Sequence, residues 1–175
     1  EIKMELNGPV SIIENSNKYI LNPEVDMGSS KWLNLYRYNE EEDNTLSAIN
    51  TLKEQGYKIV ATTPHMKSYT PSNLPLDSKV ALLYGTELKG LTDLAIEHAD
   101  EYIRIPQFGF TESYNISVSV ALIVHNLSRR LHESNIHWNL SEDEKQLIRL
   151  NWARRTLKRS EVIESEFLKK LIYQQ

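Results

Sequence analysis

Two segments of the chain carry residue types and spacings suited to binding a ligand or ordering a reaction. The first runs from Gly85 to Leu91 (GTELKGL), and the second, residues 108–115 (FGFTESYN), leads into a long apolar pattern. Glycine lets backbone approach a ligand closely, and the start of a helix offers N–H groups without internal partners. The same sequences also suit a tight structural turn and a helix N-cap, because Ser113 and Asn115 are common capping residues.

Other kinds of site have little support in the sequence. The five histidines show no metal-ligand spacing backed by carboxylates, so we predict no metal site. No cysteine is present, and no nucleophile elbow supports a Ser/His/Asp hydrolase. The first segment matches neither common glycine-rich phosphate loop, which leaves phosphate cradling without support. Four large aromatics suit base stacking but equally suit packing in a core or interface: Trp32, Tyr36, Trp138 and Trp152.

Apolar runs and helical periodicity predict the elements that hold these segments. The predicted strands are residues 10–14, 32–36, 57–61, 79–84 and 101–105. The predicted helices are one capped by Asn44 that stops at Gly56, then residues 91–98, 116–131 and 141–158, and a last one from Ser160. Ser141 and Glu144 have the spacing of a capping box at the start of the fourth helix.

The alternation of strands and helices predicts an α/β fold with a mostly parallel sheet flanked by helices on both faces. In such sheets ligands bind at the carboxyl ends of the strands. Three predicted strand ends, at residues 61–63, 84–87 and 105–107, lead into loops rich in small, polar or proline residues. If these three ends converge, they would make one pocket lined by backbone amides and a few side chains.

The composition indicates a soluble globular protein of 175 residues, with one domain and a terminal extension. No apolar run approaches membrane-spanning length and no signal peptide opens the chain, so we expect no membrane association. The lack of cysteine fits a reducing cytoplasm. Because residue 1 is Glu and not Met, we treat the chain as a fragment. The net charge is −4, with basic residues gathered near the end, which is compatible with selective RNA binding without requiring it.

Taken in order, the two segments resemble the motifs of the SpoU/TrmH branch of the SPOUT methyltransferases. Residues 82–91 (LLYGTELKGL) match the family pattern strand–G–x–E–x–x–G–L. Residues 105–119 (IPQFGFTESYNISVS) match I–P–x–x–G–x–x–x–S–L–N–V–S–V–A. Residues 28–32 and the strand ending at Thr62 also resemble family members, so the likeness spans roughly residues 10–132 with the spacing between motifs preserved.

The resemblance implies an α/β trefoil knot formed by the C-terminal part of the sheet domain, a homodimer, and S-adenosyl-L-methionine bound within the knot. It places the cofactor contacts, many of them through backbone, at Thr62, Leu83, Gly85, Ile105, Gln107 and Tyr114. The implied reaction is in-line transfer of a methyl group to a ribose 2′-hydroxyl of RNA. Matched by position, Ser113 and Asn115 hold the ribose or order the site, and Glu87 organises the catalytic loop through an arginine.

Two departures from the family pattern stand out. The family's first motif, N–x–x–A–x–x–R, has no match before Val10, and its arginine is the group assigned to activating the hydroxyl. We therefore expect these 175 residues alone to be a poor catalyst. In addition, Tyr114 stands where the family usually has leucine, which bears on cofactor affinity.

We interpret residues 1–138 as the methyltransferase domain and residues 139–175 as a C-terminal helical extension. Such an extension resembles that of the tRNA enzymes of the TrmH type, so the predicted substrate is tRNA at the D-loop guanosine 18. Its basic residues suit either RNA contact or a solvated surface: Arg154, Arg155, Lys158 and Arg159. Two alternatives stay open, namely a ribosomal RNA 2′-O-methyltransferase of the same family and a catalytically degenerate, dimeric, knotted RNA-binding or scaffold protein.

Overall fold

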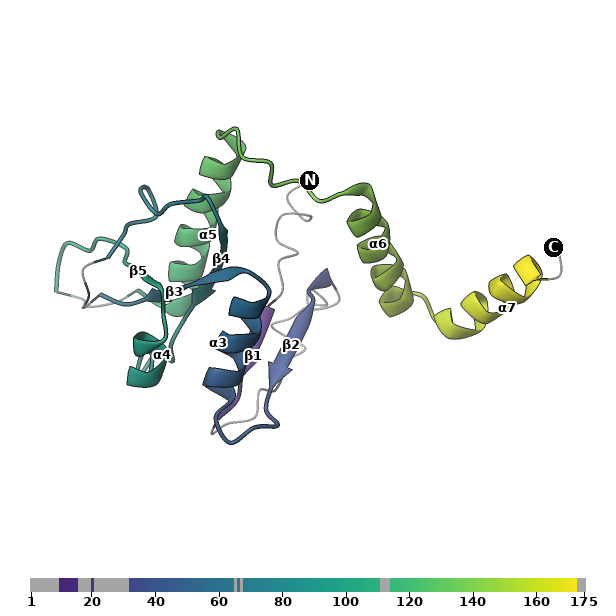
Figure 1. The fold of residues 1–175 in the computed structure, drawn as a ribbon, viewed down its shortest axis with the longest axis horizontal. Helices are drawn as coiled ribbons and strands as arrows, with labels where there is room; N and C mark the ends of the chain where they lie inside the picture. Colours follow the sequence, from purple (N-terminus) through teal and green to yellow (C-terminus); the bar gives the residue numbers. More distant parts are fainter. Residues whose placement is uncertain are drawn as a thin grey trace. The chain divides into compact units, whose positions relative to one another are not determined.

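The computed structural model describes residues 10–15, 20, 32–64, 66, 68–110 and 114–172. Its elements follow the order β1 (Val10–Ile13), β2 (Leu35–Tyr38), α3 (Asn44–Glu54), β3 (Tyr57–Thr62), β4 (Lys79–Leu83), α4 (Asp93–Glu97), β5 (Glu101–Ile103), α5 (Ile116–His132), α6 (Glu142–Thr156) and α7 (Ser160–Ile172) (Figure 1). The chain divides into two compact units. The sheet unit holds residues 11–15 and the described part of 36–137, and the helical unit holds residues 10, 20, 32–35 and 138–172.

A three-stranded parallel sheet in the order β4-β3-β5 forms the centre of the sheet unit. Tyr57 pairs with Lys79 at one end, and Thr62 pairs with Ile103 at the other, so the carboxyl ends of the three strands reach the same edge. The expected parallel α/β arrangement is confirmed. β1 and β2 form a separate two-stranded sheet, in which the Glu14 N–H donates to the Tyr38 carbonyl at 3.0 Å.

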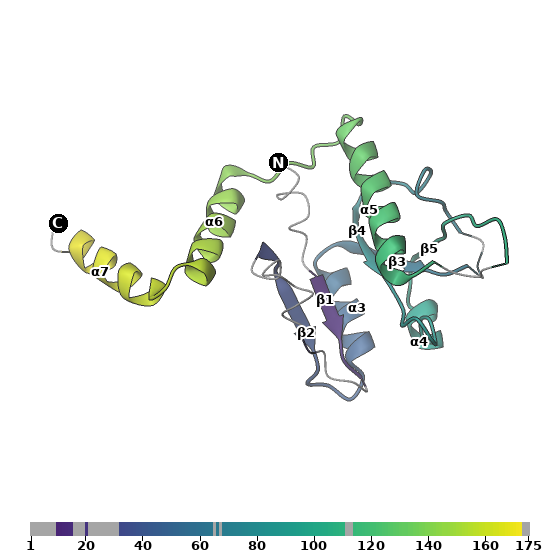
Figure 2. The same ribbon diagram turned by 180° about the vertical axis from the view of Figure 1, so that it is seen from behind.

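Helices α3 and α5 cover opposite faces of the three-stranded sheet. α3 lies toward the viewer in Figure 1 and α5 lies toward the viewer in Figure 2. Val60 packs with Ile123 and Leu127 of α5 in a buried apolar cluster. Neighbouring strand residues point to the other face, where Ile59 is equally buried. Apolar residues on both faces of β3 therefore hold the sheet between two helix layers.

The loop between β3 and β4 is fixed to the sheet unit at several points. The Tyr69 N–H donates to the Tyr102 carbonyl at 2.8 Å, and the Arg104 N–H donates to the Tyr69 carbonyl at 2.9 Å, which adds a short parallel bridge beside β5. The Arg130 guanidinium of α5 donates to the carbonyls of Pro71 at 2.8 Å and Leu74 at 2.7 Å. Leu74 is fully buried, so the loop packs as part of the core.

Two local predictions were wrong. The strand expected at residues 32–36 lies at Leu35–Tyr38, because Trp32 packs edge-to-face against Trp152 in the helical unit, with ring centroids 5.2 Å apart. The N-cap of α3 is Asp43 and not Asn44, since the Asp43 carboxylate accepts from the N–H groups of Thr45 and Leu46. Asn44 instead donates to the Glu14 carbonyl at 2.9 Å.

The remaining predicted elements are confirmed with small shifts at their ends. α4 is shorter than expected, because Thr92 caps it, and β5 ends two residues early, at Ile103. In the helical unit, the capping box of Ser141 and Glu144 opens α6 as predicted. α7 follows after Arg159, whose φ of 60° lies in the left-handed region. No helix within the described ranges has both the length and the apolar character needed to cross a membrane.

Candidate active site

The three strand ends meet at the carboxyl edge of the sheet. The Thr62 hydroxyl donates to the Leu83 carbonyl at 3.0 Å, and the Thr63 N–H donates to the Ile103 carbonyl at 3.1 Å. These bonds join the end of the central strand β3 to the ends of β4 and β5. The three strand ends therefore converge, which is the condition under which the sequence predicts one pocket.

A cavity of about 610 Å³ opens at this edge. Its walls come from the ends of β3 and β5, from the loops that follow β3, β4 and β5, and from the first turns of α5. The lining residues are Thr62, Thr63, Pro64, Tyr84, Gly85, Thr86, Glu87, Leu88, Lys89, Gly90, Leu91, Ile96, Ile103, Arg104, Ile105, Gln107, Tyr114, Asn115, Ile116, Ser119 and Ile123. This volume is that of a pocket for a small molecule or cofactor.

The loop after β4 closes on itself through backbone bonds. The Thr86 N–H donates to the Gly90 carbonyl at 3.0 Å, and the Gly90 N–H donates to the Thr86 carbonyl at 2.8 Å. A Cβ on Gly85 would lie 2.0 Å from the carbonyl carbon of Gly90 and 2.2 Å from the Leu91 nitrogen. Only glycine fits at position 85, because main chain and not a movable side chain fills that space. Gly90 turns the chain with φ of 68°.

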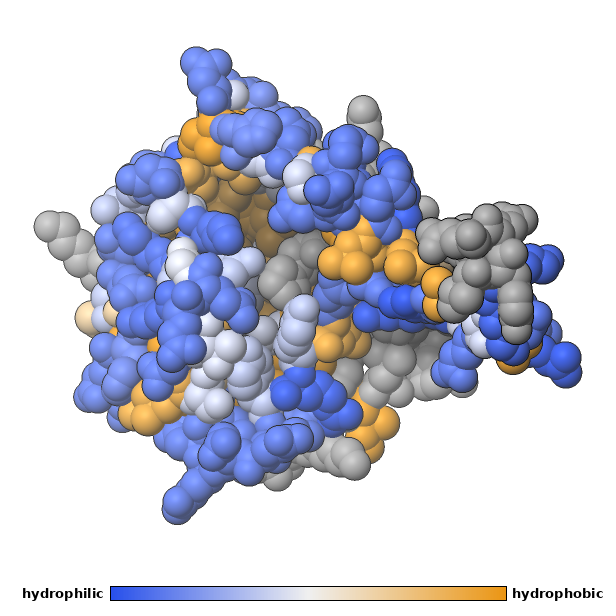
Figure 3. Space-filling model, turned by 45° about the vertical axis from the view of Figure 1, so that its right-hand side comes forward, coloured by the Kyte–Doolittle hydropathy of each residue, from blue (hydrophilic) through white to orange (hydrophobic). Residues whose placement is uncertain are grey.

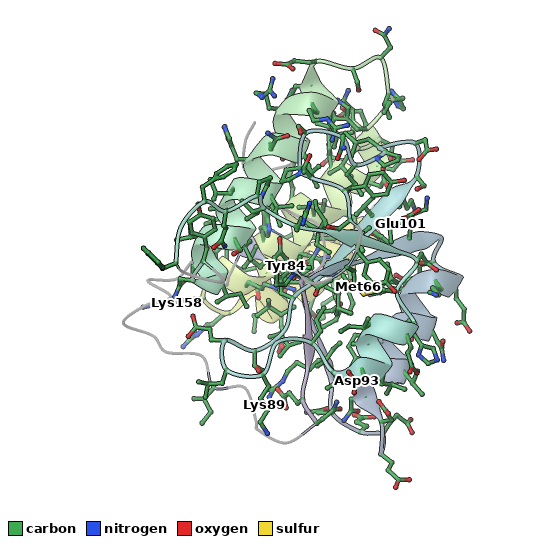
Figure 4. The ribbon with its side chains drawn as sticks, turned by 90° about the vertical axis from the view of Figure 1, so that its left-hand side faces the viewer. Met66, Tyr84, Lys89, Asp93, Glu101 and Lys158 are labelled. Atoms are coloured by element: carbon green, nitrogen blue, oxygen red, sulfur yellow. The ribbon has the colours of Figure 1, made fainter. Side chains whose placement is uncertain are left out.

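Tyr84 stands between this loop and the core. It lines the cavity and packs against the buried cluster under α5, and Figure 4 shows it amid other side chains, whereas Lys89 lies at the periphery of the view. Burial raises the pKa of the Tyr84 phenol from 10.0 to about 12. Its hydroxyl is one of three buried side-chain polar atoms that lack a hydrogen-bond partner in the described part of the chain. Its side chain is therefore neutral at physiological pH.

Glu87 and Asn115 link the loop after β4 to the start of α5. The Asn115 amide nitrogen donates to Glu87 Oε1 at 2.8 Å, while its amide oxygen accepts from the Ser117 N–H at 2.8 Å and caps α5. One side chain therefore serves both interpretations that the sequence left open for Asn115, an N-cap and a site residue. The resemblance implied an arginine partner for Glu87; among the described residues the partner is Asn115.

The predicted cofactor residues are placed as follows. Five of the six line the cavity: Thr62, Gly85, Ile105, Gln107 and Tyr114. The sixth, Leu83, is not among the lining residues, and its carbonyl accepts from Thr62. Ser113 lies outside the described residues, whereas Glu87 and Asn115 both line the cavity.

The sequence interpretation did not single out several lining residues. Arg104 follows β5 directly and lines the cavity, although neither motif contains it. Its position at the carboxyl end of a strand was the available signal, since ligands bind at that edge. Ser119 and Ile123 belong to the face of α5 turned to the cavity, one turn apart. Helical spacing from Asn115 would have identified both.

The predicted RNA-binding residues of the helical unit differ in their contacts. Arg154 forms an ion pair with Glu164 of α7, with Nε 2.9 Å from Oε2. Arg155 donates to the Leu33 carbonyl at 2.6 Å. No hydrogen bond or ion pair engages the Lys158 or Arg159 side chain within the described ranges, and both residues are exposed. Two of the four cations therefore stabilise the helical unit itself.

Comparison with known proteins identifies the relatives of this chain. Residues 8–125 match the model of the SpoU rRNA Methylase family. The tRNA (guanosine(18)-2′-O)-methyltransferase of Borreliella burgdorferi is 45% identical over 156 residues, which cover 89% of this chain and 70% of that protein. The crystal structure of the Aquifex aeolicus TrmH/SpoU tRNA modifying enzyme superposes with a TM-score of 0.70 at 24% identity, over 90% of this chain and 83% of that one.

A further solved structure contains a cofactor. The AdoMet-bound rRNA methyltransferase of Sinorhizobium meliloti superposes with a TM-score of 0.60 at 21% identity, over 74% of this chain and 50% of that one. The family model and the Borreliella relative confirm the likeness that the two motifs predicted. The chain belongs to the SpoU rRNA methylase family.

Proposed function

We propose that this chain uses S-adenosyl-L-methionine to methylate the ribose 2′-hydroxyl of guanosine 18 in tRNA, the reaction named for its Borreliella relative. The observation that carries the proposal is the Glu87–Asn115 hydrogen bond, which joins the two family motifs across a cofactor-sized cavity. The identity of 45% over most of the chain supports the same substrate. Because the proposed substrate is tRNA, we also propose that the protein acts in the cytoplasm.

The residues around the cavity fit S-adenosyl-L-methionine. Gly85 brings main chain to the wall of the cavity, where N–H and carbonyl groups suit the polar edge of adenine. Ile103, Ile105 and Tyr84 give an apolar wall of the kind on which a flat base packs. We assign the cofactor contacts to Thr62, Gly85, Ile105, Gln107 and Tyr114, with Leu83 supporting Thr62 through its carbonyl.

The cofactor, when bound, supplies a methyl group on a sulfonium that leaves readily. The protein's task is then to align the ribose hydroxyl and help to remove its proton. Asn115 holds the loop of Glu87 against the start of α5, which fixes the wall that the ribose meets. We assign Ser113 to holding the ribose, from its place in the motif. Glu87 acts as a positioning residue through Asn115.

We further propose the knotted topology and the homodimer that the family resemblance implies, with the chain before α5 threaded through a loop of the sheet unit. Large apolar side chains are exposed on the loops beside the cavity and on α5: Leu88, Phe108, Phe110, Val118 and Leu122. Figure 3 shows hydrophobic residues, in orange, at several places on one face of a mainly hydrophilic surface. Exposed apolar side chains gathered on neighbouring elements support a protein interface, which a mass measurement in solution tests.

We propose residues 1–138 as the methyltransferase domain and residues 139–175 as a helical extension that contributes to RNA binding. One compact unit ends at His137 and the other continues from Trp138, which supports this boundary. Residues 32–35 nevertheless belong to the helical unit. Because Arg154 and Arg155 have partners within the unit, we assign its RNA contacts chiefly to Lys158 and Arg159.

Transfer of labelled methyl from S-adenosyl-L-methionine to unmodified tRNA tests the function, with the product of the complete gene as enzyme. A parallel tRNA carries a 2′-deoxy residue at guanosine 18. Incorporation into the first tRNA and not the second is the expected result. Equal incorporation into both would place the methyl group elsewhere and overturn the assignment. Incorporation into ribosomal RNA alone would support the other substrate class named within the family.

A further inference from the structure

Arg104 differs from the other charged residues of the three-stranded sheet. At the amino end of the sheet, Lys53 of α3 lies 2.8 Å from Asp100 and Lys58 lies 4.0 Å from Glu101. Lys79 at the same end lies over the Tyr57 ring, 5.6 Å from its centroid, so these three cations have partners. Arg104 lies at the opposite, carboxyl end, where it is exposed and lines the cavity. Its guanidinium has no hydrogen bond or ion pair within the described part of the chain.

The backbone of Arg104 is held firmly, although its side chain has no partner among the described residues. Its N–H donates to the Tyr69 carbonyl at 2.9 Å, and Ile103 before it is fully buried in the core. Glu87, the acid among the described residues that line the cavity, accepts a hydrogen bond from Asn115. An exposed guanidinium on a fixed backbone, lining a cavity and unpaired among the described residues, is suited to an anionic ligand, because it offers two parallel N–H donors to oxyanions.

An RNA phosphate fits this position better than any part of the cofactor. A ribose can present its 2′-hydroxyl to the cavity only if the phosphates on either side of it pass the rim, and Arg104 is exposed there. The cofactor carries a positive sulfonium, which a nearby arginine disfavours. We propose, on the basis of the function proposed above, that Arg104 binds a phosphate that flanks the target ribose and thereby sets the position of the 2′-hydroxyl.

Equilibrium binding tests this inference without requiring catalysis. The variants are Arg104→Gln, Arg104→Lys and, as a matched control, Arg129→Gln, which removes an exposed arginine that pairs with Glu133 on α5. Each is measured with unmodified tRNA across a range of salt concentrations, and with S-adenosylhomocysteine as the cofactor probe. Circular dichroism checks that each variant is folded, and Arg104→Lys keeps the test valid should Arg104→Gln unfold.

We expect Arg104→Gln to weaken tRNA binding roughly tenfold relative to Arg129→Gln, since it removes a charge-assisted bond. It should also lower the salt dependence by roughly one counterion. Arg104→Lys should recover the salt dependence but only part of the affinity, because an ammonium lacks the paired donors of the guanidinium. Affinity for S-adenosylhomocysteine should not change in either variant.

A tRNA with a neutral methylphosphonate on one or the other side of guanosine 18 locates the phosphate. One of the two linkages should weaken binding by the wild type and leave binding by Arg104→Gln unchanged. Unchanged tRNA affinity in Arg104→Gln would overturn the inference. So would a loss confined to S-adenosylhomocysteine with 5′-methylthioadenosine unaffected, because Arg104 would then hold the cofactor carboxylate. If the wild type binds neither tRNA nor S-adenosylhomocysteine, the proposed function itself fails.

Discussion

The cavity of the sheet unit and the two helices of the helical unit are built by different means. Around the cavity, main chain packs on main chain, so that position 85 has room only for glycine. In the helical unit, α6 has no buried residue. Large apolar side chains are exposed on α6, on α7 and in the turn between them: Leu147, Leu150, Leu157, Val162, Ile163, Phe167 and Leu168. Side-chain contacts such as the Arg154–Glu164 pair join these helices. Residue identity is therefore restricted by backbone geometry in the first region and by local helix signals in the second.

Substitution of Gly85 has the largest expected effect, and it tests whether backbone geometry restricts residue identity at the cavity. Gly85→Ala places a methyl group about 2 Å from the Gly90 and Leu91 backbone, so the loop must move. Overpacking of this kind costs about 1–3 kcal/mol, and we expect S-adenosylhomocysteine binding to weaken roughly 10- to 100-fold, as titration calorimetry would show. Gly56→Ala is the control, because a Cβ there meets no atom within 4 Å and only its φ of 82° is unfavourable. Equal loss of binding in both variants would mean that loop geometry is unimportant.

Asn115→Asp separates the two roles of that side chain. An aspartate still accepts from the Ser117 N–H and caps α5, but it places a carboxylate against Glu87. We expect methyl transfer to fall roughly tenfold or more with little change in melting temperature, since repulsion replaces a hydrogen bond. Asn115→Ala should lower both transfer and stability, the latter by about 1 kcal/mol. A drop in melting temperature alone for Asn115→Asp would show that the residue is only a cap.

Tyr84 gives the sheet unit a distinctive response to alkaline pH. Because burial raises its pKa to about 12 in the folded protein, the unfolded chain loses this proton first, near the ordinary value of 10.0. The phenol's contribution to stability is thus complete below pH 10.0 and is lost as the pH rises through about 12. Tyr84→Phe should remove that part of the alkaline loss, measured by urea unfolding at several pH values. It should also leave stability at pH 7 equal or about 1 kcal/mol higher, because a hydroxyl without a partner is removed.

Ser141→Ala removes the side-chain N-cap of α6 in the helical unit, just as Asn115→Ala removes the side-chain N-cap of α5. Ser141 Oγ accepts from the Glu144 N–H at 3.2 Å, and the Glu144 carboxylate accepts from the Ser141 N–H at 2.7 Å. Removing the hydroxyl should cost about 1 kcal/mol, seen as faster hydrogen exchange in the first turns of α6. Binding of S-adenosylhomocysteine should stay unchanged. A loss of cofactor affinity would contradict the separation between the two regions.

The comparison also explains which features the sequence could predict. Strands β3 and β4, helices α5 to α7 and the convergence of three strand ends follow from local apolar patterns and from the rule that parallel strands end at one edge. The shift of β2 depends on the Trp32–Trp152 contact, whose residues are far apart in the chain. The capping of α3 by Asp43 depends on the bond between Asn44 and the Glu14 carbonyl. Local patterns contain neither contact.

The same limit applies to the site. The motifs contain Gly85, Glu87 and Asn115, and all three line one cavity, where close packing of main chain at position 85 leaves room only for glycine. They did not include Arg104, whose side chain makes no hydrogen bond or ion pair in the described part of the chain and so has no partner pattern in the sequence. A residue whose side chain binds only a ligand, and no other residue, can be identified only when the fold shows its position.

The smallest effects are expected for the basic residues of the helical unit, where a cation with an acidic partner can be compared with one that has none in the described part of the chain. Lys158→Gln should reduce the salt dependence of tRNA binding by roughly one counterion, because this exposed cation, which has no partner among the described residues, is free to bind phosphate. Arg154→Gln removes the same charge, but in the folded protein that charge is already opposed by Glu164, so tRNA binding should hardly change. Filter binding at several salt concentrations compares the two variants directly. If Arg154→Gln weakened tRNA binding more than Lys158→Gln, the ion pair would have to open on RNA binding, and contacts within the unit would no longer indicate which cations meet RNA.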